Sequence, residues 1–379
     1  MNERQRWLET LTFGTPDLIP LEPGHGREST LERWHQEGLP RELGTHEAIH
    51  EAYRQAGGTQ ELPRAGAAFT VDEKMIPQFE RKVISKGERS QIVQDWKGNI
   101  CEIGNEYTVD HLGGTNRTDF VTRRWIKCPV ENRKDWADMK KRYDPLSETR
   151  LPQNPAEKAK ALKNRTWPIQ FHFSGPFWQL REWLGFENLC MMLHDDPAFV
   201  EEMIEFWDDY ITKLMKHAFE YVIPDSVWLS EDMAYKSFSM ISPDMARKFL
   251  LPTWKKWGQT ILGTGVPVYA MDSDGFIGEL IPLWIEAGIN ACDPIEVAAG
   301  NDIVQLRKQF GRNMAYRGGV DKRCIAQGGK TIEDEIRRIS PVIQGGGYIP
   351  GCDHGVPHDI SWQNFIYYVK LLAKETGWL

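Results

Sequence analysis

The chain has 379 residues with a formal net charge of −8, 41% hydrophobic residues, 33 Gly and 22 Pro, which is ordinary globular composition and excludes collagen-like and disordered chains. Nucleic-acid binding depends on Lys and Arg that neutralise phosphates, so an acidic chain without a basic cluster is not expected to bind nucleic acid. The six cysteines are scattered without a Cys-x-x-Cys pair, a pattern typical of free thiols in a reducing compartment. The charged start MNERQRWLET and the lack of a long apolar run predict neither a signal peptide nor a membrane span, so we expect a cytoplasmic protein.

The first half of the chain predicts few regular elements. Residues 1–90 are punctuated by Pro and Gly and form an irregular N-terminal extension, with helices expected over 30–37 and 45–55. Two runs of β-forming residues, 91–96 and 100–103, flank a Lys-Gly-Asn turn and predict a β-hairpin. The charged, Pro-bounded residues 131–163 predict a surface helix and linker inserted before the next regular region.

From residue 167 onward, short apolar runs alternate with helical patterns. Such repeated strand–helix units favour parallel strands joined by right-handed crossovers. We expect an α/β fold, a single (β/α)8 TIM barrel over 1–379, with residues 17–21 as a candidate earlier strand. An open doubly wound sheet is the competing fold, but no Gly-rich phosphate loop is present. The predicted strands are 167–173, 226–230, 266–271, 288–292, 313–317 and 347–350, and the predicted helices are 197–218, 243–262, 278–287, 302–310 and 331–343.

Carboxylates, one Cys and one His follow the predicted strands, at the barrel end where active sites are built. Like charges that converge there need a cation, a shared proton or a metal. Two carboxylates two residues apart, followed by a Gly turn at Gly275, favour a functional role for that strand end. That pair is Asp272 and Asp274. The full set of side chains that follow the predicted strands is Glu231, Asp232, Asp272, Asp274, Asp293, Glu296, Asp321, Cys352 and His354.

Several of these side chains also have structural interpretations. An Asp after a strand often caps the next helix, because its carboxylate accepts hydrogen bonds from unpaired backbone N–H groups. On this basis we expect Asp302 and Asp359 to be caps. We expect Trp178 and Trp183 to pack in the core, with one of them forming a wall of the pocket.

At these strand ends the chain resembles the uroporphyrinogen decarboxylase superfamily. The segments that carry the resemblance are 173–180, 225–232, 266–275, 317–322 and 348–357, in matching order and spacing. The resemblance implies a (β/α)8 barrel and two kinds of enzyme, namely a porphyrinogen decarboxylase and methyltransferases that use a corrinoid cofactor. It also implies that a homodimer is an expected state.

The methyltransferase interpretation is our leading hypothesis. Zinc-dependent members carry His-x-Cys-Gly where this chain has Asp272-Ser-Asp274-Gly275, and their later Cys corresponds to Cys352. These residues would bind a divalent metal, with zinc as the first expectation, or polarise the donor atom. His354 and Glu231 would act as general acid or orienting groups. The substrate would be a small methoxylated compound or a methylamine, and a separate corrinoid protein would accept the methyl group.

We expect the substrate to contact Trp178, Asp232 and Asp321. The alternative function is a cofactor-free decarboxylase for uroporphyrinogen or a smaller acid, in which His354 and Asp95 would act. A single arginine, Arg27, stands where that enzyme carries an Arg-rich segment, and an acidic mouth repels a substrate with many carboxylates. The third hypothesis is a barrel that binds a ligand without catalysis.

Overall fold

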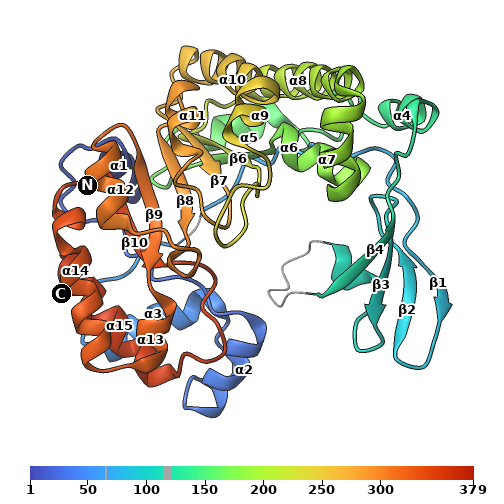
Figure 1. Ribbon diagram of the computed structural model, residues 1–379. Helices are drawn as coiled ribbons and strands as arrows, with labels where there is room; N and C mark the ends of the chain where they lie inside the picture. The colour runs from blue at the N-terminus through green and yellow to red at the C-terminus, as the bar shows by residue number, and fades with distance from the viewer. Residues whose placement is uncertain (65, 114–120) are drawn as a thin grey trace.

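The computed structural model describes residues 1–64, 66–113 and 121–379, which contain one parallel and one antiparallel sheet (Figure 1). No helix in these ranges is both long and apolar enough to cross a membrane. The helices are α1 (Glu3–Leu11), α2 (Glu28–Gln36), α3 (Thr45–Gln55), α4 (Arg133–Lys140), α5 (Pro155–Ala161), α6 (Pro176–Leu184), α7 (Phe186–Asp195), α8 (Pro197–Phe219), α9 (Pro243–Phe249), α10 (Leu251–Gly263), α11 (Ile281–Glu286), α12 (Ile303–Phe310), α13 (Lys322–Gln327), α14 (Lys330–Gln344) and α15 (Trp362–Glu375).

The parallel sheet has six strands in the order β10-β9-β8-β7-β6-β5, so neighbours in sequence are neighbours in space. Each observed strand overlaps one of the predicted runs, so the alternating strand–helix prediction is confirmed for these six units. Their bounds are β5 (Gln170–Ser174), β6 (Ser226–Ser230), β7 (Val268–Asp272), β8 (Ala291–Ile295), β9 (Ala315–Val320) and β10 (Tyr348–Cys352).

Extended segments flank the two edges of this sheet. The Cys352 N–H in β10 donates to the Pro23 carbonyl at 3.1 Å, and Gly26 forms a parallel bridge with Val356. At the other edge, the Ser174 N–H in β5 donates to the Glu73 carboxylate. Residues 17–21 do not form the predicted strand. The hydrogen-bonded ladders of the described residues therefore give an α/β fold with six parallel strands, and do not close into a ring of eight.

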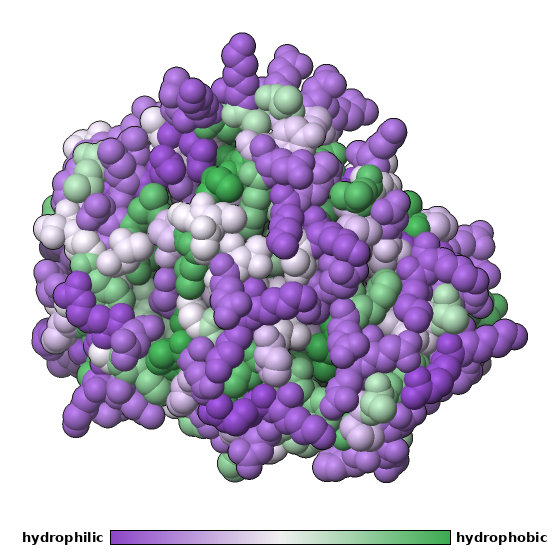
Figure 2. All heavy atoms as spheres, turned by 90° about the horizontal axis from the view of Figure 1, so that it is seen from above, coloured by the Kyte–Doolittle hydropathy of each residue, from purple (hydrophilic) through white to green (hydrophobic). Residues whose placement is uncertain are grey.

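Helices cover the outside of the parallel sheet, and their apolar faces form the main core. In α14, residues Ile332, Ile336, Ile339 and Ile343 are all buried, as their spacing predicts. The predicted helix 243–262 is split at Leu250 into α9 and α10, because the following Pro252 lacks the N–H that would continue the helix. On the face shown in Figure 2, apolar side chains appear as small islands between hydrophilic ones.

A second, smaller core fills the start of the parallel strands. Trp7 and Leu11 of α1 pack against Trp228 and against small residues on β7, β8 and β9. Those residues are Ala270, Ala291 and Ala315. Helix α1 therefore covers the interior at the amino ends of the strands and leaves the carboxyl ends for the polar side chains.

The antiparallel sheet is inserted between the extension and the parallel region. It contains β1 (Lys82–Lys86), β2 (Ser90–Gln94), β3 (Ile100–Gly104) and β4 (Arg123–Lys127), in that order. The predicted hairpin is confirmed as β2 and β3, with Gln94 opposite Ile100. Residues 131–163 form two helices, α4 and α5, where one helix and a linker were predicted.

Candidate active site

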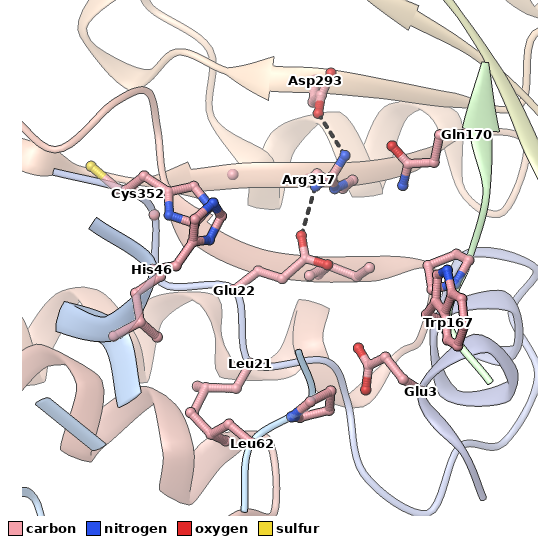
Figure 3. A pocket seen from close by; sticks show the side chains of 18 of the residues that line it. Glu3, Leu21, Glu22, His46, Leu62, Trp167, Gln170, Asp293, Arg317 and Cys352 are labelled. Atoms are coloured by element: carbon pink, nitrogen blue, oxygen red, sulfur yellow. Dashed lines mark hydrogen bonds and ion pairs between the residues drawn. The ribbon is translucent and has the colours of Figure 1, made fainter. Parts of the chain in front are cut away.

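One cavity of about 780 Å³ lies along the inner side of the parallel strands (Figure 3). Its size falls in the range of small-molecule sites. Asp272, Asp274 and Asp293 line it from the carboxyl ends of β7 and β8, and Cys352 and His354 line it from the end of β10. The structure therefore brings these five side chains together at one cavity.

A partly buried arginine holds two carboxylates together across this cavity. Arg317 of β9 donates to Glu22 at 2.7 Å and to Asp293 at 3.1 Å, as the dashed lines in Figure 3 mark. Burial raises the pKa of Asp293 to about 6, against the lowering effect of Arg317. Glu22 was missed by sequence reasoning, because it lies 295 positions from its partner in an irregular segment.

Asp272 carries the most strongly shifted carboxyl group of the strand ends. The strand register places it beside Ser230 of β6 and Asp293 of β8. The Ser230 hydroxyl donates to Oδ2 of Asp272 at 2.8 Å. Burial, followed by the charges of Asp293 and Asp232, raises the pKa of Asp272 to about 8. The carboxyl group therefore holds a proton at neutral pH.

His354 and Asp274 form a pair at the mouth of the cavity. Nε2 of His354 lies 3.5 Å from Oδ1 of Asp274, and this contact raises the pKa of the imidazole. The Gly355 N–H and the Arg27 guanidinium both face Nδ1, at 2.7 and 3.3 Å. Two donors at Nδ1 leave the ring proton on Nε2, where it points to Asp274. Asp232 supports the pair, because its Oδ1 accepts the Asp274 N–H at 3.1 Å.

The predicted metal ligands line the cavity but do not fit a metal site. Among the described residues, no three His, Cys, Asp or Glu side chains are grouped so as to hold a metal ion. Burial raises the pKa of Cys352 to about 12. Asp272 is protonated and bound by Ser230. The structure thus gives these side chains hydrogen-bonding roles in place of the predicted ligand set.

Glu231 and Trp178 are not among the residues that line the large cavity. Glu231 is fully buried and accepts hydrogen bonds from the Trp178 N–H at 2.9 Å and from Nε1 of Trp254 at 2.7 Å. Trp178 lines a separate pocket of about 140 Å³, where the Lys97 ammonium lies 5.9 Å from its ring. Neither side chain lines the large cavity, so the structure does not place them in the predicted acid and substrate-binding roles.

The carboxylates of Asp95 and Asp321 form hydrogen bonds with residues close to them in the sequence. Asp95 sits in the hairpin turn and accepts N–H bonds from Lys97 and Asn99, both at 2.9 Å. Asp321 caps α13 and is paired with Arg323 at 2.7 Å. The hydrogen bonds of a turn and of a helix cap account for these two carboxylates, so neither requires contact with a substrate. Asp302 caps α12 as predicted, whereas Ser361 in place of the predicted Asp359 caps α15.

Histidines from the irregular extension complete the wall. His25 lines the cavity from the segment beside β10, and His46 lines it from α3. Their rings meet edge to face with centroids 4.5 Å apart. Burial, with a smaller contribution from His46, lowers the pKa of His25. Sequence reasoning did not single out these residues, because no periodic pattern places the extension against the strands.

Comparisons with known proteins agree with this architecture. The family model described as "Uroporphyrinogen decarboxylase (URO-D)" matches residues 126–374. A uroporphyrinogen decarboxylase from Actinobacillus pleuropneumoniae serotype 5b (strain L20) is 23% identical over 251 residues, covering 62% of this chain and 67% of the relative. One from Serratia proteamaculans (strain 568) is 22% identical over 269 residues, covering 66% and 71%.

Among solved structures, a methyltransferase from Methanosarcina mazei matches with a TM-score of 0.60 at 13% identity, covering 99% of both chains. At this identity the likeness concerns the fold. The family model spans most of the parallel region, including every strand that contributes to the cavity. The chain belongs to the uroporphyrinogen decarboxylase (URO-D) family.

Proposed function

We propose that this URO-D family protein is a cytoplasmic methyltransferase that removes the methyl group of a small methoxylated compound. The observation that carries the proposal is the neutral Asp272 carboxyl group, which is held by Ser230 inside a ring of strand-end carboxylates. A protonated carboxyl group at the cavity wall is a general acid, and the chemistry of an ether requires one.

The acid assists departure of the oxygen. An alkoxide or phenoxide leaves poorly, so the ether oxygen must gain a proton as its bond to the methyl carbon breaks. Asp272 donates that proton and becomes a carboxylate, the oxygen leaves as a hydroxyl group, and the methyl carbon bonds to the acceptor. The Ser230 hydroxyl donates to the carboxylate that forms. A carboxylate beside Asp293 and Asp232 recovers its proton readily, which completes the cycle.

The mouth residues orient the substrate. The Nε2–H of His354 is held by Asp274, and Arg27 fixes the other side of the ring at 3.3 Å. An imidazole fixed on both sides is a rigid part of the wall against which the substrate is placed. His354 and Asp274 therefore position the donor oxygen for Asp272. A methylated amine is the second donor class that this acidic wall suits.

The acceptor in this proposal is a corrinoid carried by a separate protein, which supplies a nucleophilic cobalt. The acid-assisted role of Asp272 depends only on side chains of this chain. Because the strand-end donors do not fit a metal ion, no step in the proposal uses one.

The test is methyl transfer from methoxylated aromatic compounds in the presence of candidate corrinoid proteins. We expect the Asp272→Asn variant to lose activity by about 100-fold or more, because it removes a general acid. The rate of the wild type should fall as the pH rises above about 8, where Asp272 loses its proton. The exposed Asp195→Asn variant is the matched control. An Asp272→Asn variant with full activity would falsify this assignment.

Decarboxylation is a second candidate, favoured by the curated relatives, whose names describe uroporphyrinogen decarboxylases. The Arg27–His354 contact would face a substrate carboxylate in this case. The carboxylates Asp274 and Glu22 on the same wall oppose a substrate with many negative charges. Release of CO₂ from uroporphyrinogen by the purified protein would select this candidate over methyl transfer.

A further inference from the structure

The cavity has charged groups of opposite sign on different parts of its wall. Three strand-end carboxyl groups, those of Asp272, Asp274 and Asp293, line one part. Helix α3 and the segment after it contribute His46, His50 and Arg64 to another part. The charged groups that shift the pKa of Asp272 are those of Asp293, Asp232 and Asp274, whereas Arg64 acts on His50. Arg64 and His50 are therefore grouped on the α3 side of the cavity wall.

The two arginines that line the cavity differ in their exposure and in their ion pairs. Arg317 is partly buried and paired with both Glu22 and Asp293. Arg64 is exposed at the rim of the cavity. It forms no ion pair with any residue that the structure describes. An arginine held by two carboxylates has no remaining charge to offer a ligand. Arg64 keeps its planar guanidinium available for one.

Two histidines extend the region around Arg64. His46 and His50 are four residues apart on α3, so they lie on the same face of the helix. Burial, followed by the positive charge of Arg64, lowers the pKa of His50. Glu47 and Glu61 also act on His50, but neither lines the cavity, and Glu47 accepts the Gly44 N–H at 3.1 Å in the helix cap.

Apolar side chains also line the cavity. Leu21 and Leu62 lie close together on its wall, and Trp167 lies further along the same wall (Figure 3). Ile49 of α3 adds to this surface. A wall of this kind suits the hydrocarbon part of a ligand, with polar groups recognised at separate positions.

We infer that the cavity binds a methoxylated monocarboxylate, with the carboxylate at Arg64, His46 and His50 and the methoxy group at Asp272. The placement of the methoxy group rests on the proposed function, whereas the anion site rests on the Arg64 region alone. A guanidinium matches the planar shape and the charge of a carboxylate, and imidazole N–H groups are further hydrogen-bond donors for it. At the strand ends Arg317 is already paired with Glu22 and Asp293, so Arg64 is the better partner for the carboxylate of such a ligand.

The experiment compares two probes of nearly equal shape, 4-methoxybenzoate and the neutral 4-methoxybenzamide, by calorimetric binding without any methyl acceptor. We expect the wild type to bind the carboxylate about tenfold more tightly, as one charge-assisted contact at an exposed rim provides. The Arg64→Gln variant should lose this preference, and Arg64→Lys should keep part of it. The exposed Arg41→Gln variant, which lies outside the cavity, is the matched control and should bind like the wild type.

Equal affinity for both probes, no binding of either probe, or an unchanged preference in Arg64→Gln would each overturn the inference. The outcome is separable from that of the proposed function. A carboxylate preference that depends on Arg64, without methyl transfer, would retain the anion site and reject the methyltransferase. Methyl transfer from neutral ethers alone, without a carboxylate preference, would reject the anion site and retain the methyltransferase.

Discussion

The carboxyl group of Asp272 links the stability of the fold to pH. Its pKa is raised to about 8 in the folded chain, whereas an aspartate in an unfolded chain titrates near about 4. Between these two values the folded state holds a proton that the unfolded state has lost. The free energy of unfolding therefore falls as the pH rises through this window, and the ionisation of Asp272 accounts for part of that fall.

An Asp272→Asn variant tests this linkage, because it keeps the shape and the acceptor for Ser230 but removes the titration. We expect the variant to gain stability relative to the wild type, and this gain should be larger at pH 8 than at pH 5 by at least about 1 kcal/mol. Urea unfolding at both pH values measures the difference. Asp195→Asn, at an exposed site, should show no such pH dependence. A gain that is equal at both pH values would contradict the argument.

The six cysteines should react at different rates. Burial raises the pKa of Cys352 to about 12, and the side chain is 6% exposed, whereas Cys190 and Cys324 are partly exposed. Because the thiolate is the reactive form, we expect iodoacetamide to label Cys190 and Cys324 at least about tenfold faster than Cys352. Peptide mass spectrometry measures the rates. Labelling of the chain unfolded in urea is the control that each thiol can react with the reagent. Labelling of Cys352 as fast as that of Cys190 would contradict the argument, and labelling that appears only after a chelator is added would restore it as a thiolate ligand.

At the scale of elements, Glu231 joins the end of β6 to two helices. Its carboxyl group accepts hydrogen bonds from the first turn of α6, through the Trp178 N–H, and from the Trp254 indole of α10. A Cβ on Gly175 would lie 2.1 Å from the Glu231 carboxyl carbon, so the glycine at the start of α6 leaves room for this contact. Glu231 thus fixes the start of α6 against the parallel sheet.

A Glu231→Ala variant should lower the free energy of unfolding by about 2 to 4 kcal/mol, because it leaves two buried donors unpaired and opens a small void. Denaturant unfolding measures the loss. The exposed Glu205→Ala variant of α8 should remain within about 0.5 kcal/mol of the wild type. If Glu231→Ala instead keeps its stability and loses activity, the catalytic role expected from the sequence regains its support.

The elements that sequence reasoning predicted are those with a strong local pattern. The strands of the parallel sheet have short apolar runs, and α14 has an apolar stripe at helical spacing. The split between α9 and α10 at Leu250 was missed, since the apolar stripe continues through it and only Pro252 marks the break. The flanking segments 17–26 and 66–73 have no periodicity, so their places at the sheet edges follow from tertiary contacts.

The site was predicted only in part, for a related reason. Carboxyl ends of parallel strands converge, so Asp272, Asp274 and His354 could be placed at one cavity from strand assignments alone. The same logic wrongly put Asp321 beside them, because a strand-end aspartate and a helix-capping aspartate have the same sequence signal. Arg64 comes from outside the strand–helix repeats, where the sequence offers no geometric rule.

At the scale of the whole molecule, the two sheets have cores of very different size. The parallel sheet and its helices share one large cluster of buried side chains. The antiparallel sheet has a separate buried cluster of Val93, Cys101, Ile103 and Leu112, and all five residues of its edge strand β1 are exposed. Figure 1 shows this sheet set apart from the parallel strands. A small core gives less resistance to local opening.

We therefore expect the antiparallel sheet to open without unfolding the parallel sheet. Backbone amides of β1 and β4 should exchange with deuterium at least about 100-fold faster than those of β6 and β7, whose strands are almost entirely buried. Mass spectrometry of peptides from both sheets measures the rates, and peptides from the covering helix α8 serve as an internal reference for the slow class. The cavity side chains come from the parallel region and its extension, so opening of the inserted sheet leaves the site intact. Equal protection in both sheets would show that they unfold as one cooperative unit.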